Sequence, residues 1–90
     1  MRPPLHVVSS APKAGETVAQ RAARLMAEAH EAGDALTVEL LQSLRSFQAL
    51  VQDVAQAGEA VHVGIRDAAR KLAADLEARI QTIEAIRGRQ

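Results

Sequence analysis

The sequence predicts an all-α protein folded as a small antiparallel three-helix bundle. Apolar residues recur at spacings of three and four, as expected for helices packed through one face. Pairs of glycine and an acidic residue at positions 15–16, 33–34 and 58–59 divide the chain into segments of roughly 20 residues. Ninety residues make one domain at most. We therefore expect residues 1–12 to form an N-terminal tail and residues 13–90 to form a single helical domain.

The N-terminal tail contains all three prolines of the chain, at positions 3, 4 and 12. Proline lacks a backbone donor and disfavours the α conformation of the residue before it. We expect the tail to be extended or disordered. An alternative is that Leu5, Val7 and Val8 form a short strand or cover part of the bundle, although the rest of the chain offers no strand for pairing.

The first helix is expected over residues 14–32. Its inward side is apolar and includes small residues that allow a neighbouring helix to approach closely. These positions are Val18, Ala22, Leu25, Met26, Ala29 and Ala32. Gly33 suits the residue after a helix C-terminus, and Asp34 suits the N-cap of the next helix. A compact turn at this point predicts that the first two helices are antiparallel neighbours.

The second helix, expected over residues 35–57, has an apolar arc that covers roughly half of its circumference. The arc contains Leu36, Leu40, Leu44, Phe47, Leu50, Val51 and Val54. A two-stranded coiled coil needs only a narrow apolar seam. The width of this arc therefore predicts two neighbours, with one helix on each side.

The third helix is expected over residues 64–87. Its apolar side contains Ile65, Ala68, Leu72, Leu76, Ile80, Ile83 and Ile86. Two glycines and the poor helix formers between them predict a break from Gly58 to Gly64. However, the apolar spacing keeps its phase through this stretch, as it would in one unbroken helix. The alternative architecture is a short helix followed by one long helix, forming an elongated helical-hairpin dimer.

The composition limits the classes of partner. Eleven Lys and Arg residues balance 11 Asp and Glu residues, and the sequence pI is about 6.8. Nucleic-acid-binding domains are usually strongly basic, so this balance argues against a nucleic-acid partner. The chain has no cysteine, which excludes a disulfide or a thiolate zinc site. No apolar run reaches the length of about 18 residues that a membrane span needs. We therefore expect no transmembrane segment and a cytoplasmic location.

Catalytic residues are not evident in the sequence. His30 and Asp34 lie four residues apart and could form a metal-binding or acid–base pair, but a surface histidine near a helix C-terminus explains the same residues. The three histidines do not share the H-x-x-x-H spacing of a zinc site. No serine lies in a G-x-S-x-G motif, and no glycine-rich phosphate loop occurs. We predict a non-catalytic protein with no cofactor-binding or metal-binding residue.

The predicted function is a small helical module for protein–protein interaction or oligomerisation, of an adaptor or regulatory kind. The expected partner is the protein itself, as a homo-oligomer, or another protein. The interface candidates are Leu76, Ile80, Ile83 and Ile86, because a first helix shorter than the third would leave this end of the third helix partly uncovered. Exposed apolar patches of this kind mark interfaces. Alternatively, the tail covers these residues within one chain.

Two other functions stay open at this point. A nucleic-acid-associated regulator would use Arg66, Arg70 and Lys71 to contact phosphates, although Asp67 interrupts this basic strip and no aromatic residue lies near it for base stacking. A phasin-like coat of an apolar surface would use the alanine-rich amphipathic helices. No motif supports the second alternative, which follows from composition alone.

Overall fold

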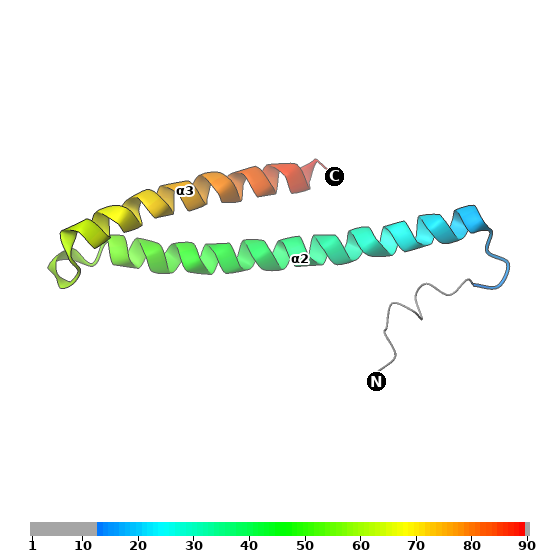
Figure 1. Cartoon of the computed structure of the whole chain (residues 1–90), viewed down its shortest axis with the longest axis horizontal. Helices are drawn as coiled ribbons and strands as arrows, with labels where there is room; N and C mark the ends of the chain where they lie inside the picture. Colours follow the sequence, from blue (N-terminus) through cyan, green and yellow to red (C-terminus); the bar gives the residue numbers. More distant parts are fainter. Residues whose placement is uncertain (1–12, 90) are drawn as a thin grey trace, which may run out of the picture. The chain divides into compact units, whose positions relative to one another are not determined.

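The computed structural model describes residues 13–89, and this part of the chain is entirely helical, with no strand. It contains helix α2 over Val18–Ala55, a single 3₁₀ turn η1 over Gly58–Ala60, and helix α3 over Val63–Gly88 (Figure 1). The all-α prediction is therefore confirmed for the described residues. The predicted tail over residues 1–12 lies outside them.

The chain divides into two compact units, Met1–Ala35 and Leu36–Gln90. The first unit contains the N-terminal half of α2, and the second contains the C-terminal half of α2 together with η1 and α3. One helical domain over residues 13–90 remains a prediction.

Helix α2 begins with a capping box in the first unit. The backbone N–H of Gln20 donates to Thr17 Oγ1 at 3.0 Å, and the backbone N–H of Thr17 donates to Gln20 Oε1 at 2.9 Å. This reciprocal pair satisfies two donors that a helix N-terminus leaves without intrahelical partners. The predicted start at residue 14 is too early, because Gly15 has a φ of 77° and belongs to the preceding turn.

The predicted break at Gly33 and Asp34 is wrong, because α2 continues through both residues. Gly33 has no positive φ in the structure, so it is an ordinary helical residue rather than a C-terminal cap. Its cost in a helix interior is only about 1 kcal/mol, and the alanines and glutamates around it are strong helix formers. A turn would have broken the backbone hydrogen bonds on both sides.

Because α2 is unbroken at this point, the described residues contain two α-helices, and a three-helix bundle is not confirmed. The helices agree with the alternative prediction of a helical hairpin. Their order differs from that prediction, since the long helix comes first and the shorter helix follows it.

Substitutions of two glycines by alanine should have opposite effects on stability. Gly33→Ala should stabilise the protein by roughly 0.5–1 kcal/mol, because alanine is the better helix former and its Cβ would meet nothing within 4 Å. Gly58→Ala should destabilise it by about 1 kcal/mol, since Gly58 has a φ of 66°. Urea unfolding followed by far-UV circular dichroism measures both changes. Destabilisation by Gly33→Ala would instead indicate a left-handed cap at this position.

The predicted break between Gly58 and Gly64 is confirmed. After Gly58 the chain makes the turn η1, and α3 then begins at Val63 with His62 as its N-cap. The backbone N–H of Gly64 donates to Nδ1 of His62 at 2.9 Å, so the imidazole takes the capping role that Ser or Asp more often has. Helix α3 spans nearly the predicted range of 64–87.

In the second unit α3 runs antiparallel to the C-terminal half of α2, and the two form a helical hairpin (Figure 1). Its core includes the buried residues Leu41, Val51, Ala69, Leu76 and Ile80. Leu44, Val54, Ala55 and Ala73 pack against this core and are partly buried. Ile80 is fully buried, with 0% of its surface exposed. Within residues 13–89, neither helix is long and apolar enough to cross a membrane.

Candidate interaction surface

One side of the hairpin carries polar contacts between the two helices. Arg45 Nη1 lies 3.1 Å from Glu77 Oε1, and Arg45 Nη2 donates to both carboxylate oxygens of Glu84 at 3.2 Å. Gln48 Nε2 donates to Glu77 Oε1 at 2.7 Å, and Gln81 Nε2 donates to the other oxygen of Glu77 at 2.9 Å. We call these five residues the polar side. The bonds from Arg45 and Gln48 join α2 to α3 in one register, whereas the bond from Gln81 to Glu77 lies within α3.

The contacts of the polar side favour the charged forms of its ionisable groups. The hydrogen bond from Gln48 is the main reason why the pKa of Glu77 is lowered, with the bond from Gln81 next and Arg45 contributing less. The hydrogen bond to Glu84 raises the pKa of Arg45. These charges are partly exposed, so each ion pair stabilises the fold only modestly. The ion pairs of the polar side therefore specify how the helices align more than they stabilise the fold.

The opposite side of α2 is apolar and exposed. At about 100° per residue, Leu41, Gln48 and Val51 point toward α3, and Arg45 lies to one side of that direction. Four apolar residues lie roughly 100° to the other side. They are Leu36, Leu40, Phe47 and Leu50, whose exposed fractions are 68%, 49%, 47% and 60%.

Helix α3 has the same division into two sides. Ile65, Leu72 and Ile86 are 57%, 40% and 48% exposed, and they lie on the side of α3 opposite to Glu77 and Glu84. Viewed along each helix from its own N-terminus, residues are rotated clockwise or anticlockwise from the direction of the neighbouring helix. In an antiparallel pair, residues rotated in the same direction on both helices lie on the same side of the pair. Arg45 reaches both glutamates on one side, so the apolar residues of the two helices share the other.

We call this shared surface the apolar face. It consists of Leu36, Leu40, Phe47, Leu50, Ile65, Leu72 and Ile86. All seven residues belong to the second unit.

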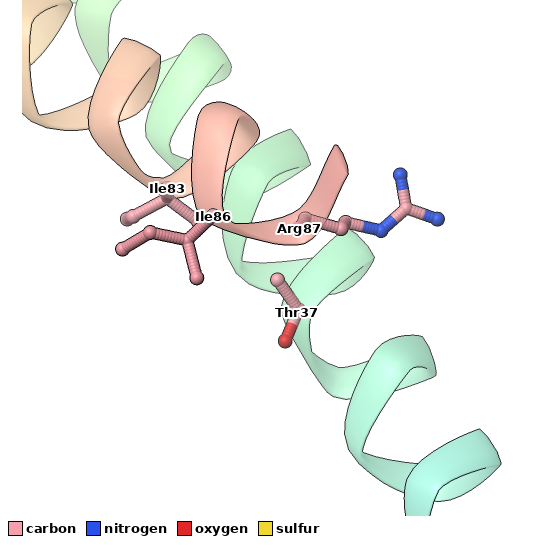
Figure 2. A pocket seen from close by; sticks show the side chains of 4 residues that line it. All are labelled: Thr37, Ile83, Ile86 and Arg87. Carbon is pink, nitrogen blue, oxygen red and sulfur yellow. The ribbon is translucent and has the colours of Figure 1, made fainter. Parts of the chain in front are cut away.

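The predicted interface residues divide into two groups. Leu76 and Ile80 are buried in the second unit, and Leu76 belongs to a cluster with Val51 of α2. Ile83 is half-buried and Ile86 is exposed, and both line a pocket of about 170 Å³ together with Thr37 and Arg87. Figure 2 shows Ile83 and Ile86 projecting to the same side of α3, with the guanidinium of Arg87 directed away from them.

The α2 residues of the apolar face were not predicted as interface residues. The predicted three-helix bundle places the apolar arc, which contains Leu36, Leu40, Phe47 and Leu50, in contacts within one chain. The available indication was the breadth of the arc, which exceeds what one neighbouring helix covers. In the described part of the chain, α3 is the neighbour of this segment, and it covers only one side of the arc.

Two further features of residues 13–89 concern their metal-ligating side chains and a second hollow. No group of three His, Asp or Glu side chains that could hold a metal ion occurs among residues 13–89. A second hollow, of about 310 Å³, is lined by Glu28, Glu31, Ala32 and Ala35, which all lie along α2.

The first unit contains a well-shielded ion pair between Glu16 and Arg24. Arg24 Nε lies 2.8 Å from Glu16 Oε2, and Arg24 Nη2 donates to Glu16 Oε1 at 3.0 Å. The two side chains are 10% and 14% exposed, respectively. The hydrogen bond from Arg24 lowers the pKa of Glu16 from its ordinary value of 4.5 to about 2, and it raises the pKa of Arg24. This bidentate pair ties the turn before α2 to the second turn of the helix.

We expect the Glu16 carboxyl to titrate with a midpoint near pH 2. Because its pKa is lower in the folded state, its contribution to stability is complete above pH 4.5 and is lost as the pH falls through about 2. NMR titration of the Glu16 side chain measures the midpoint. In the Arg24→Gln variant the midpoint should rise toward 4.5, and an unchanged midpoint would show that Arg24 is not the cause.

The fold and this surface together define a class of protein, namely an all-α protein with an amphipathic helical hairpin. No protein-family model, curated protein or solved structure matches the chain.

Proposed function

We propose that the protein is a non-catalytic helical module that acts by protein–protein contact through the apolar face. The observation that carries this proposal is the exposure of seven large apolar residues on one side of the hairpin. Their exposed fractions correspond to roughly 700 Å² of surface, against about 800 Å² per partner in a standard interface. A patch of this size on a small protein marks an interaction site.

The small core of the hairpin supports the same proposal. Five apolar residues are buried among residues 13–89, and one of them is an alanine. Chains of this size bury only about three fifths to two thirds of their unfolded surface, so their net stability is small. Burial of the apolar face against a partner would add to it. An adaptor or regulatory role and a cytoplasmic location are part of this proposal.

The alternative of a nucleic-acid-associated regulator gains no support from the basic residues of α3. Lys71 Nζ lies 3.1 Å from one oxygen of Asp67, and Arg70 Nη1 lies 3.4 Å from the other. Arg66 Nε donates to the backbone carbonyl of Val61 at 3.0 Å. Internal partners thus satisfy much of the basic strip. A phasin-like coat would use the same apolar face as a protein partner, and the experiment below separates the two.

The test is affinity capture of the tagged full chain from a lysate of its source cells, with identification of the recovered proteins. The variant Phe47→Glu/Leu50→Glu places two charges in the apolar face. The matched control, Ala49→Glu/Gln52→Glu, places two charges with the same spacing on the opposite side of α2, where both residues are exposed.

We expect the wild type and the control to recover the same stoichiometric protein, either untagged copies of this chain or another protein. The apolar-face variant should recover neither. Equal recovery by both variants would contradict the proposal. A wild type that recovers no protein, but binds apolar beads in competition with albumin, would assign the face to an apolar surface instead.

A further inference from the structure

We infer that the apolar face is covered by the apolar face of a second copy of this chain, giving a dimer with four helices at its interface. This inference rests on the proposed function and names the partner of the same surface. Two amphipathic hairpins that meet through their apolar sides form a four-helix bundle, in which each helix has two neighbours.

The extent of the apolar face fits a second copy. The arc on α2 is wide enough for two neighbouring helices, and α3 supplies one of them. A second hairpin supplies another helix to α2 and another to α3 at once, so both exposed stripes are covered by one partner. The roughly 700 Å² on each chain would bury about 1,400 Å² in total, which is within the range of stable interfaces.

The charge of the protein also favours a second copy. The formal net charge is zero, so two chains do not repel each other over a distance. Within the α3 part of the apolar face, between Leu72 and Ile86 in sequence, Arg79 Nε lies 3.0 Å from Asp75 Oδ2, so this stripe also carries one exposed ion pair. A two-fold axis brings one acid and one base from each chain to the interface, which leaves no excess of like charge.

The one-sided character of the hairpin limits the assembly to two chains. A two-fold contact uses the same surface on both copies, so the contact is closed once it forms. The other side carries Arg45, Glu77 and Glu84, which are already linked to one another and partly exposed to solvent. Within the second unit, a third copy would therefore find no equivalent apolar surface on the described residues of this other side.

Sedimentation equilibrium of the purified full chain tests the inference. We expect a mass of twice the 9.6 kDa of one chain at micromolar concentration. Phe47→Glu/Leu50→Glu should weaken dimerisation at least about 100-fold, because it places charges at the centre of the interface. The matched control, Ala49→Glu/Gln52→Glu, should dimerise like the wild type. A dimer that persists unchanged in the apolar-face variant would overturn the inference.

A second measurement covers the case in which the apolar-face variant is unfolded. The midpoint of thermal unfolding of the wild type should rise with protein concentration, because dilution favours the separated chains. The milder variant Phe47→Ala should unfold at a lower temperature and keep this dependence. A midpoint independent of concentration, or a monomeric wild type, would overturn the inference.

Failure of the dimer inference can be distinguished from failure of the proposed function. A monomeric wild type that captures a different protein through the apolar face would overturn the second copy as partner and leave the proposed function standing. A wild type that is monomeric and captures no protein through this face would overturn both the dimer and the proposed function.

Discussion

Ile80→Ala is expected to lower the free energy of unfolding by about 3 kcal/mol, the largest effect of any substitution proposed for this protein. Ile80 is fully buried, so truncation both removes apolar contacts and leaves a cavity between α2 and α3. In a protein with so small a core, a loss of this size is a large part of the total stability. Part of the population should be unfolded without denaturant.

Urea unfolding followed by far-UV circular dichroism, at one fixed protein concentration, measures this effect. Val63→Ala is the matched control, because it also truncates a β-branched residue of α3 but at a position that is 62% exposed. The control should change the free energy of unfolding by less than about 0.5 kcal/mol. Equal effects of the two substitutions would contradict the placement of Ile80 in the core.

Gln48→Ala is expected to lower the free energy of unfolding by about 2 kcal/mol, the second largest effect of a single substitution on stability. Gln48 is only 6% exposed, and its amide both accepts from Arg45 Nη1 at 3.3 Å and donates to Glu77. Alanine would leave a void and remove both hydrogen bonds. Gln48→Leu fills the same space with apolar atoms, so it should stay within about 1 kcal/mol of the wild type.

The two variants of Gln48 share one further result. The pKa of Glu77 should rise toward its ordinary value of 4.5 in both, because the hydrogen bond from Gln48 is the largest cause of its lowered pKa. NMR titration of the Glu77 carboxyl measures this change. The contribution of Glu77 to stability, present above its ordinary pKa and lost as the pH falls below it, should shrink accordingly. An unchanged pKa in Gln48→Leu would show that this hydrogen bond does not form.

Local features of the sequence predicted several elements correctly. The apolar spacing predicted α3 over 64–87, and the glycines with the poor helix formers between them predicted a break from Gly58 to Gly64. The structure has α3 over Val63–Gly88 after a turn at Gly58. The capping box of Thr17 and Gln20 was also present in the sequence, and recognising it would have corrected the start of α2.

Similar local features gave the wrong result at Gly33 and Asp34. A glycine followed by an acid occurs there as it does at Gly58 and Glu59, but only Gly58 adopts a positive φ. Ala32 precedes Gly33 and Asp34, and Ala35 and Leu36 follow them, and all three are strong helix formers, whereas the residues after Gly58 include the poorer helix formers of Val61–Val63. The pair of residues itself does not decide between a helix interior and a turn.

The sequence by itself determined that the described chain is helical and which residues are apolar, while the tertiary structure decided which of those residues meet. It buries Leu76 and Ile80, leaves Phe47 and Leu50 exposed, and places Gln48 against Glu77, 29 residues further along the chain. Helix formation depends on hydrogen bonds between residues four apart, so the residues that favour or break a helix can be read from the local sequence. The partner of an apolar side depends on distant contacts and on how two helices are aligned, and no local pattern encodes that choice.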